Sequence, residues 1–159
     1  MVKLILNMVL LSSLAGWGLI AYAEADAYGP TITLENAKQV AAKAADVARQ
    51  HNYRVAIAIV DTAGNLVYFE KLDDTQTASV DVAIAKARSA STYRRETKVF
   101  ETALSKGRTG ILGLPGAVPI EGGIPLVYES RVVGAIGVSG VTSEQDGQVA
   151  RAGADSLGQ

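Results

Sequence analysis

Few side chains in this sequence are suited to acid–base or nucleophilic chemistry. Ser139 is a conceivable nucleophile, but a serine enzyme of the common type needs a histidine base, and His51 is the sole histidine of the chain. His51 falls at the end of a predicted helix, where an exposed imidazole interacts favourably with the helix dipole. We prefer that role to a catalytic or ligand-binding one. No catalytic residue is therefore assigned.

Cysteine and metal chemistry are restricted in the same way. The chain has no cysteine, which excludes disulfides, thiolate catalysis, cysteine-based zinc sites and covalent c-type haem attachment. Asp61, Glu70, Asp73 and Asp74 are close in sequence. Turn formation, capping and solvation explain these acids more simply than metal binding. The metal ligands, if any, stay unknown.

Two charged residues have surroundings that suggest a binding role. Lys86 is the one charge in the run AIAKA, so it either extends from the rim of a buried helix face to water or projects into a cleft toward an anionic group. Glu121 precedes Gly122 and Gly123. The backbone there either lies against a flat ligand or forms a tight turn with a solvated acid. Both alternatives stay open for each residue.

The glycine-rich run GAIGVSG at 134–140 falls within a predicted strand. Its G-x-x-G-x-x-G spacing matches neither the dinucleotide-binding fingerprint nor the Walker motif. We therefore expect these glycines to let a helix or a ligand approach a central strand closely.

Hydrophobic periodicity and turn residues predict one α/β (α+β) domain with an antiparallel sheet of about five strands and helices packed on it. Strands that come in hairpin pairs argue against a Rossmann arrangement. The predicted helices are Leu34 to about His51 after the N-cap Thr33, about Ala78 to Tyr93, Thr97 to about Ser105 with Val99, Ala103 and Leu104 facing inward, and a last helix opened by a Thr142–Gln145 capping box. The predicted strands are 54–60, 66–72, 124–128 and 132–139, with a short one near 117–120 inside a Gly- and Pro-rich loop, 107–125.

The first residues resemble an export signal. Lys3, an apolar stretch from Leu4 to Ile20 and the Ala21-Tyr22-Ala23 box predict cleavage after Ala23, with an uncleaved membrane anchor as the alternative. Residues 24–30 are then a polar linker and 31–159 the domain, placed in the periplasm or secreted. The formal net charge of −1 and the absence of a Lys/Arg cluster argue against a nucleic-acid partner.

Four segments together resemble the GlcG/HbpS family of haem-binding and haem-degrading-type proteins, which is also similar to the C-terminal domain of PduO-type cobalamin adenosyltransferases. They are AIVDTAGNLVYFEKLD (58–73), SVDVAIAKARSAS (79–91), PIEGGIPLVY (119–128) and GAIGVSGVTSEQD (134–146). The resemblance extends from about Thr31 to Leu157. It implies a profilin-like fold, assembly into dimers or larger oligomers, and haem binding with a redox- or iron-sensing role outside the cell.

The resemblance also implies a haem ligand set, which this composition limits. Beyond the predicted signal the chain has neither methionine nor cysteine, so the iron would be held by His51 or by atoms of residues such as Thr109, Tyr93 and Lys86. The leading hypothesis is an exported, oligomeric binding protein for haem or a related planar tetrapyrrole, held in an apolar slot beside the Gly- and Pro-rich loop. The alternatives are a ligand-free module that docks on a membrane sensor or enzyme, and a weak enzyme that degrades haem with peroxide.

Overall fold

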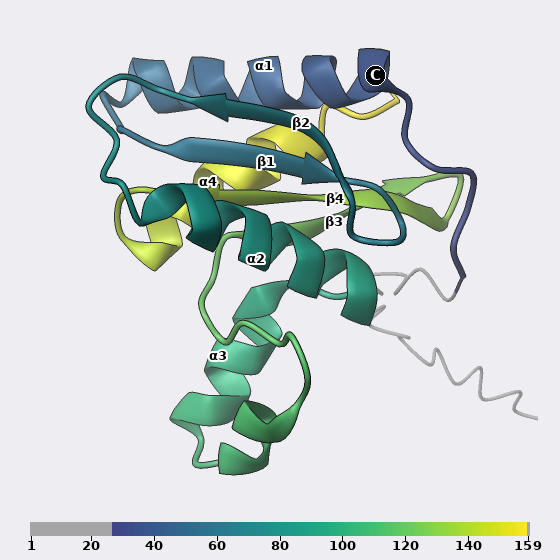
Figure 1. Cartoon of the computed structure of the whole chain (residues 1–159), viewed down its shortest axis with the longest axis vertical. Helices are drawn as coiled ribbons and strands as arrows, with labels where there is room; N and C mark the ends of the chain where they lie inside the picture. Colours follow the sequence, from purple (N-terminus) through teal and green to yellow (C-terminus); the bar gives the residue numbers. More distant parts are fainter. Residues whose placement is uncertain (1–26, 159) are drawn as a thin grey trace, which may run out of the picture.

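A four-stranded antiparallel sheet with strand order β2-β1-β4-β3 forms the centre of the protein (Figure 1). The computed structural model describes residues 27–158, so the predicted export signal lies outside the described residues. The strands are β1 (Ala56–Val60), β2 (Leu66–Lys71), β3 (Gly123–Tyr128) and β4 (Arg131–Ser139). The helices are α1 (Leu34–Gln50), α2 (Ser79–Tyr93), α3 (Thr97–Ser105), α4 (Ser143–Ala154) and the short 3₁₀ helix η1 (Thr109–Gly113).

The predicted α/β (α+β) class is confirmed, whereas the short strand expected near 117–120 is not formed. Instead of pairing with a strand, this segment is held against α2, because the Val118 backbone N–H donates to Ser89 Oγ at 3.0 Å. Pro119 has no N–H to offer a sheet. The Gly- and Pro-rich loop also contains η1, a helical turn that the sequence analysis did not predict.

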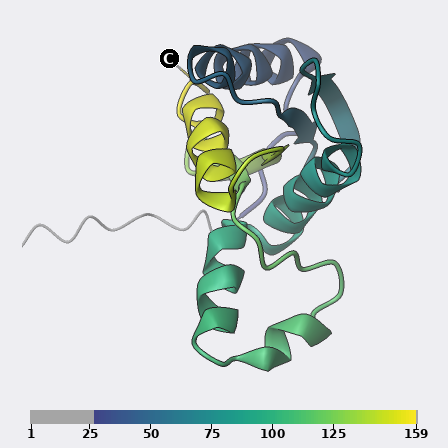
Figure 2. The ribbon, with the colours of Figure 1, turned by 90° about the vertical axis from the view of Figure 1, so that its left-hand side faces the viewer.

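Helices cover both faces of the sheet (Figure 2). On one face, Ile57 and Ile59 of β1 pack with the alanine-rich side of α1 and with Val149 of α4. On the other, Ala56, Ala58 and Val60 of the same strand pack with α2. Both faces of β4 are buried, as its lack of polar alternation predicts.

The α2 face of the sheet is built from small side chains, so the helix lies close to the strands. A Cβ atom added at Gly137 would lie 2.0 Å from Ala83 O and 2.5 Å from Ala87 N, both in α2. The prediction that these glycines admit a close neighbour is thereby confirmed for Gly137, and the neighbour is a helix of the protein itself.

The ends of the elements follow the expected local chemistry. Thr33 Oγ1 accepts a hydrogen bond from Asn36 N at the start of α1, and Thr142 and Gln145 form the predicted capping box of α4. Asp61 closes the first hairpin by accepting backbone hydrogen bonds from Ala63 and Asn65. Tyr28, which belongs to the predicted linker, forms an isolated parallel β-bridge with Val132.

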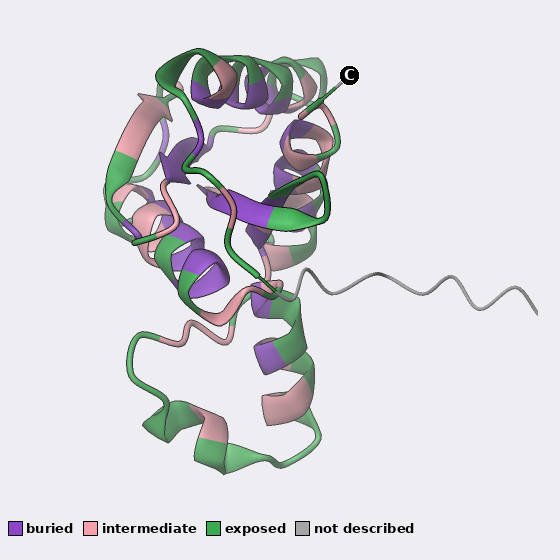
Figure 3. Ribbon diagram, turned by 90° about the vertical axis from the view of Figure 1, so that its right-hand side faces the viewer, coloured by how far each residue is buried: buried purple, intermediate pink, exposed green. Residues whose placement is uncertain are grey.

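Residues 97–120 form an arm that projects from the body of the domain (Figures 1 and 2). Most of the arm is exposed, as Figure 3 shows. The predicted inward face of α3 is wrong in part: Val99 is 50% exposed, whereas Thr97 and Phe100 are buried. The inward face was predicted for a helix packed along its whole length, but α3 projects away from the body of the domain after its first turn.

Large apolar side chains are exposed along the arm. Leu112 is 65% and Ile120 44% exposed, and Leu114 is similarly uncovered. Within the described residues no helix is both long and apolar enough to cross a membrane.

Candidate functional site

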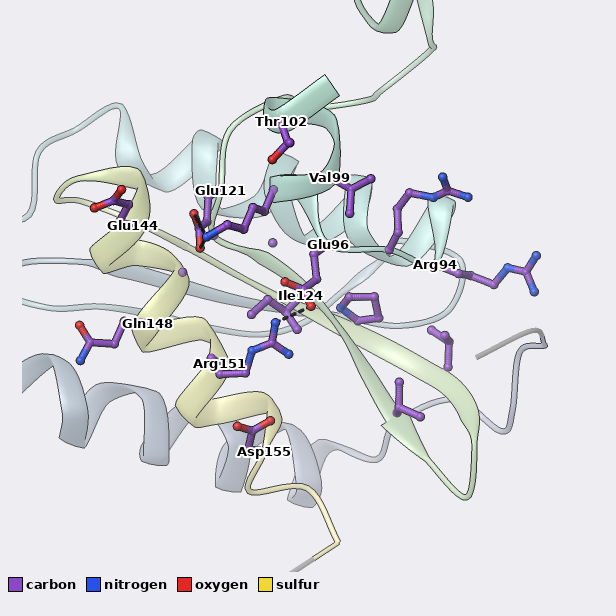
Figure 4. A pocket seen from close by; sticks show the side chains of 18 residues that line it. Arg94, Glu96, Val99, Thr102, Glu121, Ile124, Glu144, Gln148, Arg151 and Asp155 are labelled. Atoms are coloured by element: carbon purple, nitrogen blue, oxygen red, sulfur yellow. Dashed lines mark hydrogen bonds and ion pairs between the residues drawn. The ribbon is translucent and has the colours of Figure 1, made fainter. Parts of the chain in front are cut away.

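An open groove of about 1230 Å³ lies between α3, the edge strand β3 and α4 (Figure 4). Its volume exceeds the range of roughly 300–1,000 Å³ that is usual for small-molecule sites. The slot expected beside the Gly- and Pro-rich loop is therefore open, although only the end of that loop, from Glu121 to Pro125, lines it.

Apolar side chains from β3, β4 and α3 form the floor of the groove. Val99, Pro125 and Val127 expose apolar surface to the groove, whereas Ile124 and Val132, 4% and 0% exposed, lie beneath that surface. Although β3 is an edge strand, it is poorly suited to pair with another strand. The backbone N–H of Gly123 already donates to Thr97 Oγ1 at 2.9 Å, and Pro125 has no N–H. The floor is therefore suited to a ligand held by apolar surface rather than by strand pairing.

Charged side chains from α3, α4 and the loop before β3 form the rim. Lys98 Nζ lies 2.9 Å from Glu121 Oε2, and Arg151 of α4 forms an ion pair with Glu96 at the start of α3. The hydrogen bond and the charge of Glu121 raise the pKa of Lys98. Further rim residues are Arg94, Arg95, Glu144, Gln148 and Asp155.

A buried ion pair lies behind the groove. Lys86 Nζ is 2.9 Å from Asp146 Oδ2 and also donates to Val138 O at 3.0 Å, and the two side chains are 1% and 4% exposed. Burial raises the pKa of Asp146, and the positive charge of Lys86 opposes this effect. The alternative in which Lys86 reaches water is therefore wrong. The other alternative is right about an anionic partner and wrong about a cleft, because that partner is the buried Asp146.

Gly122 and Gly123 are required by this packing. Gly122 has φ of +124°, and a Cβ there would lie 2.9 Å from Lys86 Nζ. A Cβ at Gly123 would lie 2.4 Å from Lys86 O. The two glycines therefore make room for the backbone and the side chain of Lys86 in α2. Glu121, the residue before them, is paired with Lys98 and is not the solvated acid of a tight turn.

The other predicted site residues lie apart from the groove. Tyr93 donates its hydroxyl to Pro115 O at 2.7 Å and so anchors the arm, and Thr109 is exposed at the start of η1. Ser139 is buried with its Oγ 3.5 Å from Ser79 Oγ. His51 is exposed at the end of α1, stacked on Tyr53, so Ser139 and His51 do not form a nucleophile–base pair. No group of three or more His, Cys, Asp or Glu side chains in residues 27–158 is arranged to hold a metal ion.

The sequence analysis missed Glu96, Lys98, Arg151 and Asp146. Each looks like an ordinary helix residue, an acid near the start of a helix or a base on its surface. Their partners lie on other elements, so no local spacing identifies them. One signal in the sequence pointed to Asp146: Lys86 is an isolated charge in an apolar run, and a buried charge needs a partner of opposite sign. The sequence does not indicate which acid that partner is.

One antiparallel sheet covered by helices on both faces, with a ligand-sized groove at its edge, defines the class as an α+β domain suited to a small molecule. The family model described as "Haem degrading protein HbpS-like" matches residues 32–155, and the chain belongs to this family.

Relatives and solved structures agree with this assignment. Protein GlcG of Escherichia coli strain K12 is 36% identical over 108 residues, which are 68% of this chain and 81% of GlcG. The crystal structure of HbpS superposes with a TM-score of 0.76 at 30% identity, covering 82% of this chain and 93% of that one. Klebsiella pneumoniae protein ORFY gives 0.75 at 32% identity, covering 80% and 90%. A PduOC:heme complex, at 22% identity and 0.73, covers 80% of this chain and 96% of that one and shares the fold.

Proposed function

We propose that the protein is an exported binding protein for haem, or for a closely related planar tetrapyrrole, and that the guest lies in the groove between α3, β3 and α4. The observation that carries the proposal is an open groove with an apolar floor and a cationic as well as anionic rim, in a chain of the HbpS-like family. The floor offers apolar surface to a macrocycle, and the rim offers charged groups to its polar substituents. Bound haem would supply iron redox chemistry, while these residues would bind and orient it.

Hemin titration tests the proposal. We expect the purified protein to give a saturable Soret shift, and we expect Val127→Glu to weaken binding by roughly tenfold, because a carboxylate would be placed on the apolar floor. Leu66→Glu is the matched control, since Leu66 is 45% and Val127 41% exposed and both lie on edge strands, but Leu66 lies outside the groove. An unsaturable titration, or equal loss in both variants, would contradict a haem site in this groove.

We also propose that the protein assembles into dimers or larger oligomers, and the arm supports this. A nine-residue helix such as α3 is marginal without tertiary packing, and the arm leaves Leu112, Leu114 and Ile120 uncovered. We infer that a second copy covers them. Thr109 lies on the same arm and outside the groove of its own chain, so any contact between Thr109 and haem would have to be made in the groove of another copy.

Sedimentation velocity tests this assembly. We expect the protein to sediment as a dimer or larger species, and Leu112→Glu with Leu114→Glu to shift it to monomer because charges would be buried at the contact. The control is Leu34→Glu, a 51% exposed leucine on α1. A wild-type monomer at all concentrations up to roughly 100 μM, well above a micromolar Kd, would refute the inference.

A further inference from the structure

One ion pair of the rim crosses the groove. Arg151 on α4 contacts Glu96 at the N-terminus of α3 through its Nη2 and Oε1 atoms, and both residues line the groove. Figure 4 shows the pair joining the two walls. The side chains are 41% and 32% exposed, so the pair is open to water and to any ligand that enters.

Such a pair is readily exchanged. An exposed ion pair contributes about 0–1 kcal/mol, because water and salt screen it and both long side chains lose freedom. A guanidinium binds carboxylates in general, frequently through two parallel hydrogen bonds. A carboxylate carried by a ligand can therefore replace that of Glu96 on Arg151 at little cost.

The second rim pair has the same character. Lys98 is 55% exposed and is held by Glu121, so a second cation of the groove already has a carboxylate partner. Arg94 and Arg95 add cationic side chains to the same lining. The groove thus combines an apolar floor with two cations, Arg151 and Lys98, that are bound to acids of the protein.

We propose that the groove selects ligands that carry carboxylates, with Arg151 as the recognising residue and Glu96 as the internal carboxylate that the ligand displaces. This inference rests on the proposed function and names the chemical feature of the guest that is recognised. It makes Glu96 a competitor of the ligand. If the pair only held α3 and α4 together, removal of either partner would weaken ligand binding in the same way.

Opposite signs in two variants separate these explanations. For hemin, which carries two carboxylates, we expect Arg151→Gln to weaken binding roughly tenfold through the lost charge-assisted hydrogen bonds. We expect Glu96→Gln to tighten binding by about threefold or more, because the guanidinium is then without its internal carboxylate. Hemin dimethyl ester should bind the wild type more weakly than hemin and respond little to Arg151→Gln.

The matched control is Arg49→Gln, which removes an exposed arginine from its ion pair with Glu70. Glu70 lies on β2, the edge strand opposite β3, and neither residue lines the groove. It should leave hemin binding unchanged, and thermal melts of all variants report any folding defect. Equal binding of hemin and its ester by the wild type, or weaker binding in both Arg151→Gln and Glu96→Gln, would overturn this inference alone. Failure of both macrocycles to bind the wild type would overturn the proposed function, and this inference with it.

Discussion

Replacing Asp146 by alanine is expected to lower the free energy of unfolding by about 3–5 kcal/mol, which is the usual cost of breaking a buried ion pair by removing one partner. The variant leaves the Lys86 ammonium 1% exposed and without a counter-charge. It also removes the acceptor for the Val141 N–H, which now donates to Asp146 Oδ1 at 3.1 Å. Urea denaturation followed by far-UV circular dichroism measures the loss.

Two further variants make this prediction specific. Asp46→Ala removes the acid of an exposed pair with Arg49 and should change stability by less than about 1 kcal/mol. The double variant Lys86→Met with Asp146→Leu should recover much of the loss, because an apolar pair has no charge to desolvate. A loss in Asp146→Ala no greater than in Asp46→Ala would show that the buried pair is not a stability determinant.

Gly137→Ala is expected to destabilise the protein by at least about 1–3 kcal/mol, the range for overpacking a core. The new methyl group would lie 2.0 Å from Ala83 O and 2.9 Å from Ala87 Cβ, so α2 would have to move away from the sheet. Thermal and urea unfolding of the variant measure the effect.

Gly110→Ala is the matched control for the same substitution. A Cβ at Gly110 would have no neighbour within 4 Å, and this glycine does not have a positive φ. We expect a change within about 0.5 kcal/mol, as for ordinary surface substitutions. Equal effects at the two positions would contradict the close approach of α2 to the sheet.

Local signals in the sequence predicted most of the fold. The cap residue Thr33, the Thr142–Gln145 box and the turn chemistry around Asp61 depend on neighbours a few positions away, and the structure confirms each of them. Both hairpins were predicted for the same reason. The strand near 117–120 failed because a side chain of α2, Ser89, takes the hydrogen bond that a sheet would have needed.

The site was less predictable because it depends on contacts between distant elements. Lys86 and Asp146 are 60 positions apart, and the groove pairs join α3 to α4 and to the loop before β3. Periodicity shows which side of a helix is apolar but not what covers it, so Val99 was assigned to the interior although it lines the groove. The family resemblance identified Glu121, Gly122 and Gly123 as part of the matching segments, but it could not identify the helix residues opposite them.

The hydrogen bond from Gly123 to Thr97 and the position of Pro125 have a consequence for crowded conditions. A free sheet margin is where folded chains begin to add to one another as fibrils. At the β3 edge, two backbone positions, Gly123 and Pro125, have no N–H free to pair with another strand. A neighbouring chain would therefore form few hydrogen bonds by extending the sheet. Any contact between copies at this edge would therefore be made by side chains rather than by strand pairing.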